Sequence, residues 1–275
     1  MQGTHQDARL VPGTVLDSYR VVHYLASGKT GDIYEVAHTK LSRSFALKLL
    51  HPALAQSPEA VQRFLREGKD AGRLEHPNIV TMHDLGVFEG RPYLIMELLA
   101  GETLATRLGR GAMPLHDALG VALPLVAGLA TAHAAGVVHR DLKPENLFLT
   151  AEGIRVLDFG LTKQAAECGI TQSGTTLGTP QYMSPEQAGD AKHVGPAADV
   201  WAIGVMVFQV FSEGGLPYRG KNAGEVLAAL ASDRRQAVPA HVPSAWKALI
   251  EWCLQRVPAN RPKDADAVRF AFEDC

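Results

Sequence analysis

The distribution of apolar residues changes near residue 100, and this change restricts the folds open to the chain. From residue 19 to about 50, β-branched and aromatic residues recur in the short runs YRVVHYL, DIYEV and SFALKLL, which predicts three antiparallel strands. Ser57-Pro58-Glu59 then predicts the start of a helix, with Ser as the N-cap and Pro in the first turn. Two further strands are expected at residues 80–87 and 92–98.

After residue 100 the pattern becomes helical. Apolar residues recur at helical spacing from Leu115 to His133, which predicts one long helix that contains Pro124. Further helices are expected at residues 199–213, 223–232, 243–253 and 264–272. The chain is therefore predicted to be an α+β protein of two lobes. One lobe has a small five-stranded antiparallel sheet with one main helix, and the larger lobe is mainly helical. A ligand cleft is expected where they meet.

Charge and cysteine content exclude several classes of protein. The chain has 27 Lys and Arg against 29 Asp and Glu, so it lacks a strong electrostatic attraction to nucleic acid. Its three cysteines lie far apart without a CxxC pair, which argues against a zinc site or disulfide framework and favours a reducing compartment. The N-terminus has no signal-peptide pattern, and the most apolar run, residues 200–211, is too short to cross a bilayer. We expect a cytoplasmic protein with no membrane segment in this chain.

The segment HRDLKPEN at residues 139–146 has the most specific chemical pattern. Asp141 and Asn146 lie among turn-forming residues, and the later segment LDFG adds a second carboxylate, Asp158. One carboxylate that orients a hydroxyl group, with an amide and a carboxylate that hold Mg²⁺, suits phosphoryl transfer from ATP, in which positioning and charge neutralisation dominate. The alternative is a tight turn in which Asp and Asn only cap the backbone.

These motifs resemble those of the protein kinase family, in its bacterial branch of eukaryotic-type Ser/Thr kinases. The resemblance extends over about residues 13–273, and the motifs occur in the family's order. It implies a bilobal kinase domain at residues 13–275, preceded by a tail at residues 1–12. Within the domain it implies an N-lobe at 13–96, a hinge at 97–100 and a C-lobe at 101–273. It also implies ATP, Mg²⁺ (with Mn²⁺ as an alternative metal) and a protein substrate.

Residues 25–33 resemble the glycine-rich loop that covers the phosphates of ATP. Glycine allows backbone N–H groups to approach phosphate oxygens closely. Ala26 stands where the family has its first glycine, and Ile33 replaces the usual valine. The residues that the resemblance assigns to ATP binding here are Leu25, Ala26, Ser27, Gly28, Lys29, Gly31 and Ile33. Without the other motifs, two glycines would indicate only an ordinary hairpin.

Lys48 lies within the apolar strand FALK, which resembles the strand that bears the family's lysine. An unpaired ammonium group would be costly there, so Lys48 is expected to bind ATP phosphates and a carboxylate. Glu67, in RFLREGKD, matches the helix glutamate that supplies this carboxylate. The alternatives are a lysine that extends to solvent and a solvated surface charge.

Met96-Glu97-Leu98-Leu99 resembles the hinge whose backbone pairs with adenine, with Met96 as the gatekeeper. The resemblance places Ala46 and Phe148 on either side of the purine. Phe148 is bulkier than the leucine that the family more often has at this position. A methionine at position 96 is otherwise typical of a hydrophobic core.

In the catalytic loop, the resemblance implies that Asp141 accepts or orients the proton of the substrate hydroxyl group. It implies that Lys143 steadies the phosphate as it is transferred. A lysine two residues after the aspartate is typical of Ser/Thr-directed kinases. Asn146 and Asp158 would bind Mg²⁺, a hard cation that prefers oxygen ligands.

Residues 158–186 resemble an activation segment. Arg140 could pair with a phosphate on this segment and order it, so we predict autophosphorylation, first at Thr171 and Ser173. The full set of candidate hydroxyl groups is Thr171, Ser173, Thr175 and Thr176. The alternative is a solvated Ser/Thr-rich loop. Thr179 is expected to be a structural and substrate-positioning hydroxyl group beside Asp141.

The resemblance gives three further charged residues structural roles. Glu186 and Arg261 would form a buried salt bridge that anchors the end of the activation segment. Asp199 would cap the backbone of the catalytic loop. The alternatives are two surface charges and a helix N-cap.

Three functions fit a chain of this kind. The leading prediction is a Ser/Thr protein kinase that is activated by phosphorylation of its activation segment. A pseudokinase scaffold is disfavoured because Lys48, Glu67, Asp141, Asn146 and Asp158 are all present. A small-molecule phosphotransferase is disfavoured because Ser184-Pro185-Glu186, Asp199 and Arg261 fit the recognition of an extended peptide. The sequence identifies no protein substrate and gives no support for a dimer. A small complete kinase and the catalytic domain of a longer protein both fit a chain that ends at Cys275.

Overall fold

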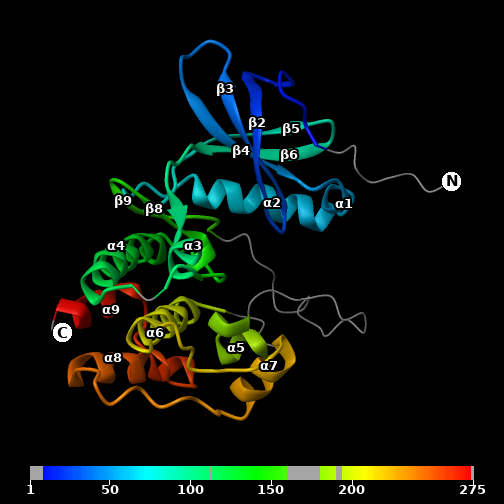
Figure 1. Cartoon of the computed structure of the whole chain (residues 1–275). Coiled ribbons are helices and arrows are strands. Elements are labelled where there is room, and N and C mark those ends of the chain that lie inside the picture. Colours follow the sequence, from blue (N-terminus) through cyan, green and yellow to red (C-terminus); the bar gives the residue numbers. More distant parts are fainter. Residues whose placement is uncertain (1–8, 112, 160–179, 190–193, 274–275) are drawn as a thin grey trace. The chain divides into compact units, whose positions relative to one another are not determined.

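The computed structural model describes residues 9–111, 113–159, 180–189 and 194–273. The chain divides into two compact units (Figure 1). Unit 1 contains Met1–His76 and Val80–Ala100, and unit 2 contains Pro77–Ile79 and Gly101–Cys275.

Unit 1 is built on a six-stranded antiparallel sheet in the order β1-β2-β3-β4-β6-β5. The strands are β1 (Val15–Leu16), β2 (Tyr19–Ser27), β3 (Gly31–His38), β4 (Ser44–Leu50), β5 (Met82–Phe88) and β6 (Arg91–Glu97). The five longer strands correspond to the five predicted ones. The sixth, β1, is only two residues long, so its sequence has no alternation that could have indicated a strand.

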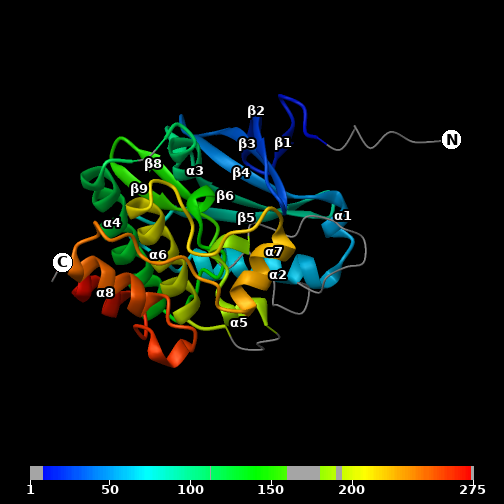
Figure 2. The ribbon, with the colours of Figure 1, turned by 60° about the horizontal axis from the view of Figure 1, so that its bottom comes forward.

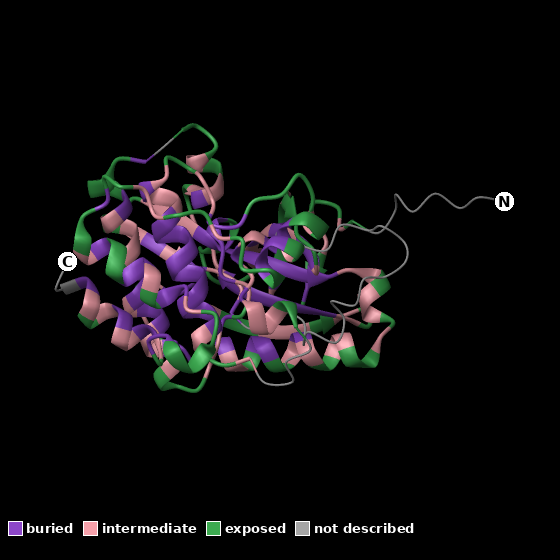
Figure 3. Cartoon of the chain, turned by 90° about the horizontal axis from the view of Figure 1, so that it is seen from below, coloured by how far each residue is buried: buried purple, intermediate pink, exposed green. Residues whose placement is uncertain are grey.

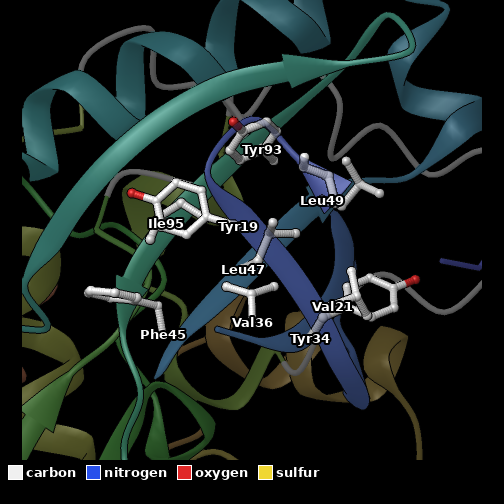
Figure 4. Close-up of a cluster of buried hydrophobic side chains, with 10 residues drawn as sticks. Tyr19, Val21, Tyr34, Val36, Phe45, Leu47, Leu49, Tyr93 and Ile95 are labelled. Carbon is white, nitrogen blue, oxygen red and sulfur yellow. The ribbon is translucent and has the colours of Figure 1, made fainter. Parts of the chain in front are cut away.

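The hydrophobic core of unit 1 lies on one face of this sheet (Figure 4). Because side chains alternate along a strand, Phe45, Leu47 and Leu49 of β4 all point into this core. The other core residues are Leu16, Tyr19, Val21, Tyr34, Val36, Tyr93 and Ile95. The same alternation places Ala46 and Lys48 on the opposite face of β4.

Helix α2 (Pro58–Ala71) lies along that opposite face, after the short helix α1 (Pro52–Ala55). It begins as predicted, because the Oγ of Ser57 accepts a hydrogen bond from the N–H of Ala60 at 3.3 Å. Gly68 lets the helix approach β6 closely, since a Cβ at this position would overlap the side chain of Leu94.

Unit 2 is mainly helical. Its helices are α3 (Leu104–Leu108), α4 (Leu115–Ala134), α5 (Pro185–Ala188), α6 (Ala197–Phe211), α7 (Ala223–Ala231), α8 (Ser244–Cys253) and α9 (Ala265–Glu273). A three-stranded antiparallel sheet is formed by β7 (Glu102–Thr103), β8 (Leu147–Thr150) and β9 (Gly153–Val156). Helices α4 and α6 to α9 were predicted. The sequence analysis did not predict α3, α5 or the small sheet, whose elements are too short to show a period.

Helix α6 forms the core of unit 2. It is buried along almost its whole length, as is typical of a helix that is apolar on all sides. It lies between α4 and α8, as Figures 1 and 2 show. Gly204 allows close contact with α8, because a Cβ there would come within 2.6 Å of the Cβ of Cys253.

Helix α4 is the one helix in the described ranges that is long and apolar enough to cross a membrane, with a mean hydropathy of 1.5. The most apolar run of the sequence, residues 200–211, lies in α6 instead. About a third of the apolar window of α4 is buried, and Val126 and Leu129 are fully enclosed within unit 2, where α4 packs against α6 and α9. Figure 3 shows helices that carry buried and exposed residues along the same helix, as amphipathic helices do.

Candidate active site

The backbone that precedes Asp141 is held in an unusual conformation by a buried carboxylate. Arg140 has a φ of 66°, a left-handed value that is uncommon for residues other than glycine. The N–H groups of His139 and Arg140 each donate a hydrogen bond of 2.8 Å to Asp199. Asp199 lies in the first turn of α6 and is 1% exposed. Its carboxylate therefore fixes the peptide groups from which the side chain of Asp141 projects.

Gln187 holds the same backbone from another element. Its Nε2 donates a hydrogen bond of 2.6 Å to the carbonyl oxygen of Arg140. Its Oε1 accepts hydrogen bonds of 3.1 Å from the N–H and the hydroxyl group of Ser184, at the start of α5. This role was not predicted from the sequence. The pattern Ser-x-x-Gln could have indicated the start of α5, but no spacing rule links Gln187 to Arg140.

His133 of α4 supports Asp199 from the other side. Its Nδ1 accepts a hydrogen bond of 3.1 Å from the N–H of Ala265, so Nδ1 carries no proton. The proton of a neutral imidazole is then on Nε2, which donates to Asp199 at 2.9 Å. From the sequence, His133 was predicted only to lie on the apolar side of a helix.

Asp199 remains ionised in this buried position. Burial alone would raise the pKa of its carboxyl group, but the hydrogen bonds from His133 and from the backbone of His139 outweigh that effect, and the pKa lies below the ordinary value of 3.8. Because the pKa is lower in the folded chain than in the unfolded chain, the stabilisation is present at neutral pH and is lost as the pH falls through the folded-state value.

We expect Asp199→Asn to lower the free energy of unfolding by about 3 kcal/mol at neutral pH, because a single amide oxygen cannot accept all three hydrogen bonds. The difference between variant and wild type should begin to shrink below about pH 4, where the carboxyl group of the unfolded wild-type chain becomes protonated, and should disappear as the pH falls through the lower pKa of the folded chain. Urea unfolding from neutral to acid pH measures both effects. Asp117→Asn, which changes an exposed carboxylate on α4, is the control. Equal stability of Asp199→Asn and wild type at neutral pH would contradict this role.

Asp141, Lys143 and Asn146 form one connected cluster. The Nζ of Lys143 lies 2.5 Å from Oδ2 of Asp141. The Nδ2 of Asn146 donates to the carbonyl oxygen of Asp141 at 2.7 Å and lies 3.3 Å from its Oδ2. The side chain of Lys143 is 8% exposed and that of Asp141 is 31% exposed. The carboxylate is thus oriented by a cation and an amide yet is accessible to a hydroxyl group, as a general base must be.

Asn146 and Asp158 are connected through Leu157. The N–H of Leu157 donates to the carbonyl oxygen of Asn146 at 2.8 Å, and its own carbonyl oxygen lies 2.8 Å from Nε2 of His139. Asp158 follows directly, with a φ of 54°. Since Nδ2 of Asn146 is engaged by Asp141, Oδ1 is the atom of this amide that a metal can use. This oxygen and the carboxylate of Asp158 fit Mg²⁺, which takes few protein ligands and completes its shell with phosphate and water.

The end of the predicted activation segment is fixed by a buried ion pair. Two nitrogens of Arg261, Nη1 and Nη2, each donate to one carboxylate oxygen of Glu186 at 2.7 Å. The Arg261 side chain is fully buried, and it also donates to three backbone carbonyl groups, of Ala197, Gln255 and Arg256. The ring of Trp201 lies beneath the guanidinium group, 4.9 Å from its carbon.

The predicted phosphorylation sites Thr171, Ser173, Thr175 and Thr176 lie outside the described residues, as does Thr179. Arg140, the predicted partner of a phosphate, is exposed. Its carbonyl oxygen and N–H are both engaged, as described above, so its side chain projects from a fixed backbone.

In unit 1, Lys48 and Glu67 are both buried, at 3% and 7% exposure. Lys48 is opposite Leu94 in the pairing of β4 with β6. Gly68, the residue after Glu67, contacts the side chain of the same Leu94. The structure therefore brings Lys48 and Glu67 to one region of unit 1, where burial requires that charged groups have polar or charged partners.

The predicted glycine-rich loop is the hairpin between β2 and β3. Ala26 pairs with Ile33, and the N–H of Gly28 donates to the carbonyl oxygen of Gly31 at 2.9 Å. Gly31 has a packing reason to be glycine, because a Cβ there would overlap the carbonyl group of Leu49. Leu25 and Ser27 lie on β2, and Lys29 lies in the turn.

The residues predicted to surround adenine lie on three strands. Ala46 of β4 is directly opposite Met96 of β6, and both are buried. The N–H of Glu97 donates to the carbonyl oxygen of Thr81 at 3.0 Å, and Leu98 follows the end of β6. Phe148 lies in unit 2 on β8, paired with Thr103 and partly buried.

The chain is similar to known protein kinases over most of its length. The family described as "Protein kinase domain" matches residues 19–272. The serine/threonine-protein kinase PknL of Mycobacterium tuberculosis is 38% identical over 265 residues, which cover 94% of this chain and 66% of PknL. PknA of the same species is 36% identical, with coverage of 93% of this chain and 61% of PknA. The chain thus spans about two thirds or less of the length of these relatives.

A solved structure is similar over nearly the whole chain. The crystal structure of the Mycobacterium tuberculosis PknI kinase domain matches with a TM-score of 0.74 and 27% identity, over 97% of this chain and 99% of that one.

Proposed function

This chain belongs to the protein kinase family, and on that premise we propose that it transfers the γ-phosphoryl group of Mg-ATP to serine and threonine hydroxyl groups of proteins. The observation that carries the proposal is the cluster of Asp141, Lys143 and Asn146. In it a solvent-accessible carboxylate is held by a cation and an amide on a backbone that Asp199 and Gln187 fix.

Each residue of the cluster has a distinct role in this proposal. Asp141 orients the substrate hydroxyl group and accepts its proton. Lys143 neutralises charge on the phosphoryl group as it is transferred. Asn146, through Oδ1, and Asp158 would hold Mg²⁺. When bound, the metal neutralises phosphate charge and so supports a reaction that depends on positioning.

We propose nucleotide-binding roles for residues of unit 1 and for Phe148 of unit 2. Lys48 binds the phosphates of ATP, with Glu67 as its carboxylate partner. The hairpin at residues 25–33 covers the phosphates. Ala46, Met96 and Phe148 contact the purine, and the backbone at Glu97 and Leu98 pairs with it.

Regulation by phosphorylation is part of the proposal. Phosphate on Thr171 or Ser173 would pair with the guanidinium group of Arg140, which is exposed and adjacent to Asp141. Such a pair would couple the activation segment to the catalytic loop. A cytoplasmic location is proposed with it, because ATP and protein substrates are available there.

Incubation of the purified chain with γ-labelled ATP, Mg²⁺ and a Ser/Thr-rich acceptor protein tests the function. We expect label on serine and threonine of the acceptor, its loss when EDTA removes the metal, and added phosphate between residues 160 and 180 by peptide mass analysis. Nucleotide binding without any transfer would instead identify a scaffold. Transfer to metabolites but not to proteins would identify a small-molecule phosphotransferase.

A further inference from the structure

His51 links the end of β4 to the tip of the β2–β3 hairpin. Its backbone N–H donates to the carbonyl oxygen of Thr30 at 2.9 Å, and its ring Nε2 lies 2.8 Å from the carbonyl oxygen of Gly28. A carbonyl oxygen can only accept a hydrogen bond, so Nε2 carries a proton and donates it. His51 thus holds two of the three residues in the turn, one through its backbone and one through its side chain.

The other ring nitrogen faces a buried carboxylate. Nδ1 of His51 lies 3.6 Å from Oδ2 of Asp32, and Oδ1 of Asp32 accepts a hydrogen bond of 2.7 Å from the hydroxyl group of Ser27. The side chains of His51 and Asp32 are 26% and 8% exposed. Ser27 and Asp32 are paired residues at the end of β2 and the start of β3. The imidazole therefore contacts both the turn and the strand pair next to it.

Local helix formation does not account for these contacts. His51 is the N-cap residue of α1, but its side chain makes no capping hydrogen bond. The two ring nitrogens of His51 are directed at the hairpin instead. Lys48 lies on β4, three residues before His51, so a shift of the end of β4 would be transmitted to the loop through His51.

The bond to Gly28 fixes the direction of one peptide group. Peptide bonds are planar and trans, so the carbonyl group of Gly28 and the N–H of Lys29 point in opposite directions. With the carbonyl group held by His51, this N–H is directed to the other side of the turn. Glycine has wide conformational freedom, and without this contact the peptide at Gly28 could rotate. Fixing it before a ligand binds reduces the ordering cost of binding.

We propose that His51 is a positioning residue for nucleotide binding: through its Nε2–H bond to Gly28, it holds the glycine-rich loop in the conformation that receives the phosphates of Mg-ATP. The inference rests on the proposed kinase function. It assigns to His51 an effect on nucleotide affinity rather than on the chemical step.

Two amide variants separate the contacts of the ring. In His51→Gln the amide nitrogen is the same number of bonds from the backbone as Nε2, so it can still donate to Gly28. In His51→Asn the amide reaches only the position of Nδ1, near Asp32. His23→Asn is the matched control, because His23 also pairs with a carboxylate across β2 and β3, Glu35 at 3.5 Å, but does not contact the turn.

The dissociation constant of Mg-ADP, measured by calorimetry on the full chain, is the primary readout. We expect His51→Asn to raise it about fivefold, the value of one ordinary hydrogen bond. His51→Gln should restore it to within about twofold of wild type, and His23→Asn should leave it unchanged. In kinetic assays the same fivefold change is expected in KM for ATP, with kcat at saturating ATP unchanged. Thermal unfolding checks that each variant is folded.

Equal Mg-ADP affinity of His51→Asn and wild type would overturn the inference, as would a His51→Gln variant as weak as His51→Asn. A change in kcat alone would also overturn it, because that would place His51 in the chemical step. Absence of Mg-ADP binding by the wild-type chain would instead remove the proposed function on which the inference rests, so the two failures are distinguishable.

Discussion

Replacing Asp141 by asparagine is expected to lower kcat for phosphoryl transfer about a thousandfold, with little change in nucleotide affinity or stability. A general base contributes typically a hundredfold to ten-thousandfold to a rate, and asparagine cannot accept the proton of a hydroxyl group. The Asp141 side chain is 31% exposed, and asparagine keeps an oxygen that can accept a hydrogen bond from the Nζ of the buried Lys143, so the ammonium group keeps a polar partner. The loss should therefore lie in the reaction and not in folding.

Initial rates of label transfer at saturating ATP, together with the dissociation constant of Mg-ADP, measure this effect. Asp117→Asn makes the same chemical change at an exposed position on α4 and should keep the wild-type rate. A rate for Asp141→Asn within tenfold of wild type would show that this carboxylate is not the base.

Glu186→Ala is expected to reduce the free energy of unfolding by roughly 4 kcal/mol, because it leaves the Arg261 guanidinium group buried without its counter-charge. Arg261 is fully buried, and Glu186 accepts two of its hydrogen bonds at 2.7 Å. The three carbonyl groups that it also contacts satisfy donors but do not neutralise the charge.

Urea unfolding at neutral pH measures this destabilisation. The control is Glu152→Ala, which removes an exposed carboxylate in the turn between β8 and β9 and should change the stability by less than about 0.5 kcal/mol. Loss of kinase activity is expected to accompany the destabilisation, since Glu186 is next to Gln187, which holds the catalytic loop. A Glu186→Ala variant as stable as wild type would contradict the structural role of the pair.

The elements that could be predicted from the sequence are those whose signals are local. Helix α2 has a serine N-cap and an early proline, and α6 is an apolar run of helical length. The strands of unit 1 alternate because one face is core. The strands β1 and β7 are only two residues long, which is too short to show a period, and neither was predicted. Strand β1 pairs with the adjacent start of β2, whereas β7 pairs with the distant β8.

Part of the candidate site could be predicted for a different reason. Asp141, Asn146 and Asp158 belong to short motifs whose residue types suggest their chemistry. The residues that hold these side chains in place belong to no such motif, because the supporting contacts join distant segments of the chain. Gln187 and Arg140 are 47 residues apart, and His133 and Asp199 are 66 apart. Neither spacing corresponds to any periodicity of helix or strand.

Gly31 has a packing reason to be glycine in addition to the role that the resemblance implies. The resemblance assigns it to phosphate binding, but the structure also requires glycine there, because a side chain would overlap the backbone of β4 at Leu49. Ala26 pairs with Ile33 next to an irregularity in the register of β2 and β3, so the methyl group that replaces the family's first glycine is accommodated within the strand pairing of the hairpin.

A crystal structure of the chain with Mg²⁺ and a non-hydrolysable ATP analogue would test the central claim most directly. The account predicts a metal ion bound at about 2.1 Å by Oδ1 of Asn146 and by the carboxylate of Asp158, with the analogue's phosphates on that metal. A triphosphate bound with its metal away from both Asn146 and Asp158 would contradict it.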